Sequence, residues 1–335
     1  MTYLADKLFL LFFSYSFLGW IWESSYTSIK AMKFINRGFL YGPLIPIYGF
    51  SALVILILTF NFKDNIFLVY IVGLLSASVM EYFTGYMMEK IFHMRYWDYS
   101  KHKFNLNGHI SLFVSIFWGF FSLLLVYVVN PFVSDFIKSI PNVFSEYIAI
   151  IISIAFAVDT TISVQSAFDM KKLLREISEK NKIYITIDQK VHQVLDNINY
   201  TSEDIQSEIL QIKNYFSKNI TEELSKIGDI LSNEKSLDKK RGILFRISFK
   251  VEQSISYIND RIKNAKSNEE LEQLYKILDS LESINITLFN FSKKRNEITQ
   301  KEFKIAKSIL KRNPGFLSFK FKKSLEEIRE KLKNL

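Results

Sequence analysis

The chain of 335 residues contains no cysteine and only 11 glycines. Without cysteine it cannot form disulfides, thiolate metal sites or a cysteine nucleophile. It also lacks the patterns of an ATP-binding P-loop (G-x-x-x-x-G-K-[ST]), a zinc peptidase helix (H-E-x-x-H) and a serine hydrolase turn (G-x-S-x-G). His93, His102 and His109 lie close together, but their spacing is not that of a metal site. We therefore predict no catalytic residue, no metal ligand and no cofactor within this chain.

The first half of the chain has no net charge. Residues 1–170 hold ten basic and ten acidic side chains, so the whole net charge of +9 belongs to residues 171–335. Hydrophobic residues make up 49% of the sequence and are concentrated in the first of these parts. This division predicts a transmembrane domain over residues 1–170, followed by a basic, water-exposed domain over residues 171–335.

Five apolar segments are long enough, or nearly so, to cross a hydrocarbon core of about 30 Å. The second begins with Pro43 and Pro46, as fits a helix start or a broken first turn. Pro131 and Pro141 bracket a segment that is too short to cross and is either a loop or an interfacial helix. The predicted spans are residues 8–29, 43–60, 66–90, 110–129 and 146–168.

Basic residues are distributed unevenly among the loops. Those after the second and fourth spans carry only Lys63 and Lys138, whereas those after the first and third carry three and four. By the positive-inside rule, the loops after the first and third spans and the long tail are cytoplasmic. The sequence thus predicts a multi-pass protein of the bacterial inner (plasma) membrane, with its N-terminus outside.

Three carboxylates, Glu23, Glu81 and Asp159, lie within predicted spans. A charge at mid-membrane costs about 2.5–3.5 kcal/mol on insertion scales, so it usually faces a cavity or a partner. Two interpretations stay open. The carboxylates line a polar cavity that opens to the cytoplasm, or they pair with residues such as Arg37 or Arg95 and hold helices together.

The segment from Glu81 to Gly108 is the most informative part of the membrane half. Glu81, Gly85 and Glu89 fall on one helical face, because successive residues turn by about 100°. A polar, aromatic loop follows, which we interpret as the lining of a site. The predicted substrate or cavity-lining residues are Glu23, Arg37, Glu81, Glu89, Arg95, Trp97, Asp98, Tyr99, Asn105, Asn107 and Asp159.

The loop after the first span, FINRGFLYGPLIPIYG, is rich in glycine and proline. Irregular backbone at membrane depth is tolerated only where it is buried or lines water. Free N–H groups there would favour an anion beside Arg37, although a compact re-entry turn explains the loop nearly as well. Residues 105–108 predict a second turn, before the fourth span. The predicted structural turn residues are Gly38, Gly42, Pro43, Pro46, Gly49, Gly85 and Gly108.

Four blocks of sequence carry a resemblance to a known family. They are GWIWES (19–24), NRGFLYGPLIPIYG (36–49), EYFTGYMMEK (81–90) and RYWDYSKHKFNLNGHISL (95–112), and together they resemble the putative ABC-transporter type IV (CmpB-like) membrane family. The C-terminal RNPGFLSFKFKKSLEEIREKL is similar to the end of some members. The resemblance implies a permease-type protein, in which His109 stands where a basic residue, often arginine, is expected. The residues carried over by position are Trp20, Glu23, Arg37, Gly38, Tyr41, Gly42, Pro43, Pro46, Gly49, Glu81, Gly85, Glu89, Trp97, Asp98, Tyr99, Asn105, Asn107 and Gly108.

The tail has the pattern of amphipathic helices. Apolar residues recur at spacings of three or four over residues 205–231, and a second helix is expected over residues 237–265. Ser267 begins a capping box that opens a long helix toward Arg312, and a short basic helix is expected from Leu317. We expect the first tail helix to continue directly from the fifth span. A bundle within one chain and a coiled coil between chains both stay open. The basic clusters favour anionic lipid over nucleic acid as a partner.

The predicted fold class is all-α: a polytopic membrane helical bundle of about five transmembrane helices, followed by a cytoplasmic helical or coiled-coil domain. The first functional hypothesis is a transport component, with ATP, if it is used, bound by a separate partner subunit. Because five spans are few for a transporter that acts alone, we expect a homo-oligomer or a partner subunit. The alternatives are a membrane-anchored scaffold or sensor whose tail recruits partners, and a membrane-embedded enzyme that uses Glu81, Glu89 and Asp98 as acid and base.

Overall fold

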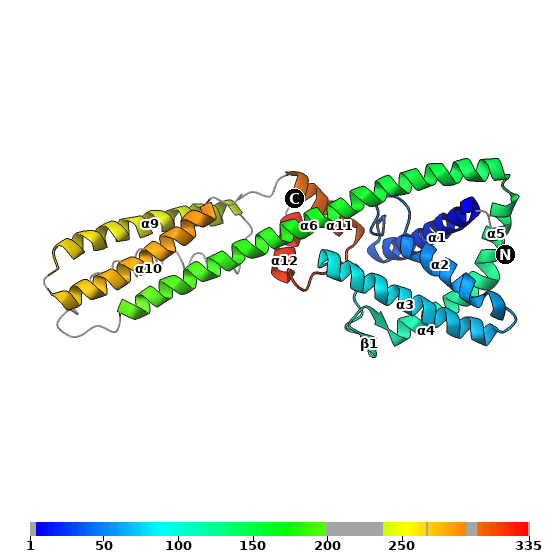
Figure 1. Ribbon diagram of the computed structural model, residues 1–335, viewed down its shortest axis with the longest axis horizontal. Helices are drawn as coiled ribbons and strands as arrows, with labels where there is room; N and C mark the ends of the chain where they lie inside the picture. The colour runs from blue at the N-terminus through cyan, green and yellow to red at the C-terminus, as the bar shows by residue number, and fades with distance from the viewer. Residues whose placement is uncertain (1–4, 199–236, 266, 293–299, 334–335) are drawn as a thin grey trace. The chain divides into compact units, whose positions relative to one another are not determined.

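The computed structural model describes residues 5–198, 237–265, 267–292 and 300–333 (Figure 1). The structure is 80% helical, and its described part contains one two-stranded sheet, so the predicted all-α class is confirmed.

Packing divides the chain into two units. The first consists of Met1–Leu173 and Gln300–Leu325, and the second of Leu174–Thr299 and Glu326–Leu335. The predicted domain boundary at residue 171 lies close to the first of these divisions. The return of Gln300–Leu325 to the first unit is a feature that the sequence analysis did not anticipate.

The first unit is built almost entirely from helices that are long and apolar. Three stretches in the described part can cross a membrane by length and composition, namely Ile66–Phe92, Leu112–Ser139 and Asn142–Glu179, and Pro46–Phe62 is a shorter apolar helix. These agree with four of the five predicted spans in position, and the count of five stays a prediction. In chain order the elements are α1 (Ala5–Ala31), α2 (Pro46–Thr59), the 3-10 turn η1 (Phe60–Phe62), α3 (Ile66–Phe92), α4 (Leu112–Leu124), the π-helical turn η2 (Leu125–Val129), α5 (Asn130–Ser139), α6 (Asn142–Ile198) and α11 (Gln300–Arg312).

The sequence analysis placed the end of the fourth span before Pro131, but the helix continues past this residue. The π-helical turn η2 immediately precedes it, and the N–H of Asn130 bonds the carbonyl of Leu125, five residues back. The residues before the proline stay helical, because Val129 and Asn130 both have right-handed helical backbone angles. The short segment after Pro131 is therefore neither a loop nor a separate interfacial helix, but the continuation of one helical stretch, Leu112–Ser139.

Exposed apolar side chains and close helix contacts both fit a membrane environment. Phe113, Phe117 and Phe120, spaced for one face of α4, are each more than half exposed. Small residues let the helices approach closely: a Cβ added to Gly19 would strike the ring of Tyr48. Such small-residue contacts are typical of packing between membrane helices.

A short β-hairpin leads from the loop after α3 into α4. Its strands, β1 (Asn105–Leu106) and β2 (Ile110–Ser111), are antiparallel. Asn107 and Gly108 both have positive φ, of 52° and 73°, as a type I′ turn requires. The Asn105 side chain accepts the Gly108 N–H at 3.0 Å. The turn predicted for residues 105–108 is thus present, within a hairpin rather than as a simple helix cap.

A C-terminal arm, defined here as residues 313–321, follows α11 and packs within the first unit. Leu317 forms an antiparallel bridge with Arg95, with N–H to oxygen distances of 2.8 and 2.9 Å. The predicted basic helix therefore does not begin at Leu317; α12 begins at Lys322 and runs to Lys333. Backbone pairing with the loop after α3 holds the arm extended and delays the helix start.

The second unit contains an antiparallel pair of helices, α9 (Leu237–Lys263) and α10 (Asn268–Ser292). Ser267 caps α10, because its Oγ accepts the Glu270 N–H at 3.1 Å. This confirms the predicted helix start. Of the helix predicted to run toward Arg312, the structure describes α10 and α11, and residues 293–299 between them lie outside the described part. The predicted helix over residues 205–231 lies outside the described part.

The α6 helix continues without a break from the membrane half into the tail, as expected. It spans 57 residues from Asn142 to Ile198 and contributes to both units (Figure 1). At its beginning, Ser145 Oγ contacts the Asp6 carboxylate near the start of α1. The beginnings of α1 and α6 therefore lie on the same side of the bundle, as the predicted orientation requires.

Candidate functional site

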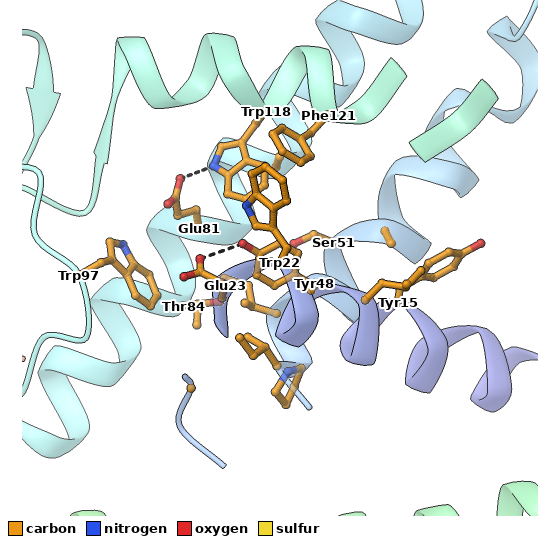
Figure 2. Close-up of a pocket in the computed structure, with 18 of the residues that line it drawn as sticks. Tyr15, Trp22, Glu23, Tyr48, Ser51, Glu81, Thr84, Trp97, Trp118 and Phe121 are labelled. Atoms are coloured by element: carbon orange, nitrogen blue, oxygen red, sulfur yellow. Dashed lines mark hydrogen bonds between the residues drawn. The ribbon is translucent and has the colours of Figure 1, made fainter. Parts of the chain in front are cut away.

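A cavity of about 510 Å³ lies among α1, α2, α3 and α4. Five of the predicted cavity-lining residues border it, and they come from two helices and two loops. Aromatic and aliphatic side chains make up most of the remaining lining (Figure 2). The five are Glu23, Arg37, Glu81, Trp97 and Tyr99.

Glu81 is the most deeply buried carboxylate of the site, with 6% of its surface exposed. Its Oε1 accepts the Tyr99 hydroxyl at 3.0 Å. Its Oε2 accepts the Trp118 indole N–H at 2.7 Å (Figure 2). Burial, followed by the charge of Glu81, raises the pKa of Tyr99 well above its ordinary value. The phenol therefore stays protonated and available as a donor. Both oxygens of Glu81 thus bind neutral donors.

Glu23, on α1, lies at the edge of the same cavity. Its Oε1 accepts the Tyr48 hydroxyl at 2.9 Å, and its Oε2 lies 3.8 Å from the Arg37 Nε. The rings of Tyr48 and Trp118 pack edge to face with centroids 5.7 Å apart. Two carboxylates that the sequence places 58 positions apart are therefore joined by a chain of aromatic donors, Glu23–Tyr48–Trp118–Glu81 (Figure 2).

Arg37 is held by several groups at once. Its guanidinium donates to the backbone oxygen of Tyr96 at 2.9 Å and to the Asn313 side chain at 2.8 Å, in addition to its contact with Glu23. Its own N–H is bound by Ser24 Oγ at 3.1 Å. The guanidinium thus joins α1, the loop after α3 and the C-terminal arm, and it forms one wall of the cavity.

Asp159 does not line this cavity. Its two oxygens accept the N–H groups of Tyr41 and Gly42 at 2.9 and 2.8 Å, and Ser163 also contacts it. A Cβ at Gly42 would lie only 2.9 Å from the carboxylate. The free N–H groups predicted before the second span do hold an anion, and it is a side chain of this protein. The Gly/Pro loop is therefore fixed by α6.

Glu89, Arg95 and Asp98 form a separate cluster. Arg95 binds Glu89 at 2.7 Å and Asp98 at 3.2 Å, and His109 lies 3.3 Å from Glu89. Burial and the nearby Arg95 lower the pKa of His109 below its ordinary value, which favours the neutral imidazole. Gly85 lies beneath this loop, because a Cβ there would meet His109 at 3.0 Å. The cluster fixes the loop after α3 against the helix.

Glu81, Gly85 and Glu89, which were predicted to share one helical face, all lie within α3, but they serve different purposes. Glu81 faces the cavity and Glu89 holds Arg95. Asn105 and Asn107 shape the hairpin and do not border the cavity. Of the predicted turn residues, Gly38 and Gly108 have positive φ, whereas Gly49 and Gly85 lie inside helices at close contacts; Gly42 and Pro43 lie in the loop, and Pro46 begins α2.

Arg312 and Asn313, which sequence reasoning did not assign to the site, secure the arm. Arg312 donates to the backbone oxygens of Phe39 and Leu40 at 2.9 and 2.6 Å and stacks 3.9 Å over the Tyr41 ring. The side-chain oxygen of Asn313 accepts a hydrogen bond from Arg37, and its NH2 group donates to the Gly38 carbonyl at 3.0 Å. Asn313 also borders the cavity. The RNPG sequence noted above was the only signal that pointed to these residues.

Tyr48 and Trp118 were also missed. Both lie in continuous apolar runs, where an aromatic residue ordinarily indicates only packing. A buried carboxylate needs donors, and a tyrosine or tryptophan in the same bundle can supply them at little cost in burial. That requirement, applied to each apolar run, would have suggested these residues as candidates.

The fold and the cavity define a polytopic membrane protein with a buried, carboxylate-bearing pocket. Residues 10–164 match the model of the family described as putative ABC-transporter type IV, so the resemblance inferred from the four sequence blocks is confirmed over this region. No curated protein and no solved structure matches the chain significantly. The matched region contains every cavity-lining residue except Asn313.

Proposed function

We propose that this protein is the membrane component of a transport system and that the cavity among α1–α4 is part of its substrate path, open toward the cytoplasm. The observation that carries the proposal is that Glu81, which is buried, and Glu23, which is partly buried, border one cavity among apolar helices. Carboxylates retained at membrane depth ordinarily mark ion or substrate pathways. The family match to residues 10–164 supports the same class of function.

The packing of the first unit supports a cytoplasmic location for the Arg37 side of the cavity. Arg37 and Arg95 lie in the two loops that are rich in basic residues, and both contact the C-terminal arm. These three segments therefore lie on one side of the bundle. By the positive-inside rule that side is cytoplasmic.

Energy must come from outside this chain if ATP drives transport, because the sequence has no P-loop. We propose a partner subunit that binds ATP, acting on a homo-oligomer or a heteromeric complex. Purification from native membranes in mild detergent tests this: a nucleotide-binding protein should be recovered in stoichiometric amount. Recovery of a homo-oligomer alone would contradict the ATP-driven mechanism.

Cysteine labelling tests whether the cavity opens to the cytoplasm. The absence of native cysteine makes every introduced thiol unique. Ser51→Cys and Thr84→Cys place a thiol in the cavity lining. A membrane-impermeant maleimide should label both in inside-out vesicles and neither in right-side-out vesicles.

Two exposed serines supply matched controls for this experiment. Ser100→Cys, in the loop after α3, should label only from the cytoplasmic side, and Ser139→Cys, at the end of α5, only from outside. Labelling of the cavity positions from outside alone, or from neither side while the controls react, would refute a cytoplasm-facing cavity.

A membrane-anchored scaffold or sensor is the second candidate. The observation in its favour is that α9 and α10 form a helical pair in a unit that lies outside the family match. Removing residues 237–292 separates the two proposals, because it leaves the cavity and the arm in place. Loss of function on this deletion, with wild-type function in Glu81→Gln, would support the scaffold.

A further inference from the structure

The charge of the cavity is not balanced by its own residues. Two carboxylates and one guanidinium line it, and the guanidinium already contacts Glu23. Within the described part of the chain, no basic side chain lies within ion-pair distance of Glu81. Its two hydrogen-bond donors, Tyr99 and Trp118, are neutral. A cation in the cavity would therefore complete the electrostatics of the site.

An anion is disfavoured by the same geometry. Arg37 is the only cationic side chain among the lining residues, and its guanidinium is engaged by Glu23, Tyr96 and Asn313. To bind an anion it would have to leave partners on three different segments. The anion-binding N–H groups of the neighbouring loop are occupied by Asp159.

A continuous aromatic wall runs from the carboxylates into the cavity. Tyr48 contacts Trp118, Trp118 contacts Phe121 at 5.8 Å between centroids, and Phe121 contacts Trp22 at 5.0 Å. All four border the cavity, and Figure 2 shows the rings of Trp118, Phe121 and Tyr48 gathered beside Glu81 and Glu23. Aromatic faces attract cations, and organic ammonium ions are recognised by such clusters.

The size and lining of the cavity favour an organic cation over a bare metal ion. About 510 Å³ lies within the range typical of pockets for small organic molecules. Among the described residues no group of three or more His, Asp or Glu side chains is placed to hold a metal ion. A mostly apolar surface with one uncompensated carboxylate matches an apolar body that carries a single positive charge.

We propose that the cavity binds a hydrophobic organic cation, such as a substituted ammonium or phosphonium ion, with its charge near Glu81 and its apolar groups against Tyr48, Trp118, Phe121 and Trp22. This inference rests on the proposed transport cavity and names the class of substrate that it takes. Glu23 adds a second, weaker attraction, since Arg37 already shares its charge.

A pair of probes that differ only in the sign of charge tests the proposal. Tetraphenylphosphonium and tetraphenylborate have the same shape and opposite charge. Their binding to the purified full-length protein is measured by titration calorimetry in detergent, with protein-free micelles as the blank. The phosphonium should bind at least about tenfold more tightly than the borate, because a buried carboxylate attracts one and repels the other.

Variants locate the binding. Glu81→Gln keeps the size of the side chain and should weaken phosphonium binding about tenfold or more, and Trp118→Leu should weaken it by removing one aromatic face. Glu23→Gln should have a smaller effect and covers the case in which Glu81→Gln fails to fold. Asp135→Asn, an exposed charge on α5, is the matched control and should bind as the wild type does. Thermal melting checks the fold of each variant.

Equal binding of the two probes, tighter binding of the borate, or no binding of either would overturn the proposal. Unchanged phosphonium binding in folded Glu81→Gln and Glu23→Gln would also overturn it. Maleimide labelling of the Ser51→Cys and Thr84→Cys variants is independent of these results. A cavity that labels from the cytoplasm but does not prefer the cation would leave the transport proposal standing and remove only the substrate class.

Discussion

The attachment of the C-terminal arm depends chiefly on Arg312, and its replacement should open the arm locally. The Arg312 side chain is 7% exposed and makes two hydrogen bonds to the loop after α1, to Phe39 and Leu40. Its guanidinium also stacks on Tyr41 at 3.9 Å. In Arg312→Ala all three interactions are lost, and the two carbonyl oxygens lose their charged donor.

The magnitude follows from these contacts. A hydrogen bond from a charged donor contributes about 1.5–3 kcal/mol, and a cation–π contact adds about 0.5–2 kcal/mol. Two features reduce the sum: water replaces part of the lost bonding, and the Nε of Arg312 is buried without a hydrogen-bond partner among the described residues. We therefore expect the free energy of arm opening to fall by about 3 kcal/mol, which corresponds to a change of about 150-fold in the opening equilibrium.

Hydrogen exchange measures this opening directly. The backbone bridge between Arg95 and Leu317 protects one N–H on each strand, with bonds of 2.8 and 2.9 Å. In Arg312→Ala, exchange of both should accelerate by about two orders of magnitude, because local opening governs their protection. Lys311→Ala, at the exposed neighbouring position, is the control and should leave the rates unchanged.

Two outcomes would refute the reasoning. Unchanged exchange at Arg95 and Leu317 would mean that Arg312 does not hold the arm. Equal acceleration throughout α9 and α10 would mean that the substitution unfolds the chain globally rather than releasing the arm. Arg312→Lys keeps the charge but loses the planar donor pair, and should fall between the wild type and Arg312→Ala.

Two further predictions concern packing and pH dependence. Gly19→Ala would drive a methyl group into the ring of Tyr48, so the melting temperature in detergent should fall by the equivalent of about 1–3 kcal/mol, whereas Gly315→Ala, with nothing within 4 Å, should not change it. The pKa of His93 is lowered by partial burial and by the ammonium groups of Lys320 and Lys171, so the folded state binds fewer protons than the unfolded state. Attachment of the arm should therefore weaken as pH falls below about 6.5. A pH-independent exchange rate at Leu317 would contradict this.

Local patterns predicted much of the fold. Runs of apolar residues located the membrane helices, and the side-chain oxygen of Ser267 located the start of α10 because the capping signal is contained within four residues. Asn107 and Gly108 indicated a turn because both tolerate positive φ. In each case the deciding interaction lies within a few positions along the chain. The prediction at Pro131 was wrong, since a π-helical turn that lets a helix continue past a proline has no clear sequence pattern.

The contacts made across the fold were much less predictable. Arg312 and Asn313 reach the loop after α1 over more than 270 positions of sequence. We expected a helix from Leu317, but pairing with Arg95 and the hydrogen bond from Ser318 to the His93 carbonyl hold this segment against the loop after α3. Asp159 was singled out because it lies within a predicted span, yet its partners include a pair of backbone N–H groups that no pattern of side chains reveals.

Each of the two interpretations of the intramembrane carboxylates, structural pairing and cavity lining, fits a different residue. Glu23 has a cationic neighbour, Arg37, which is what structural pairing predicts, although the 3.8 Å separation and the shared cavity leave it accessible to a ligand. Arg95, the other cation considered, is taken by Glu89, so Glu81 has only neutral donors. Glutamine has the same size as glutamate and keeps one acceptor oxygen for the Trp118 N–H, while its NH2 group can donate to the Tyr99 hydroxyl oxygen. Glu81→Gln is therefore the substitution that separates structure from function: a stable fold with lost binding would assign the charge of Glu81 to the ligand.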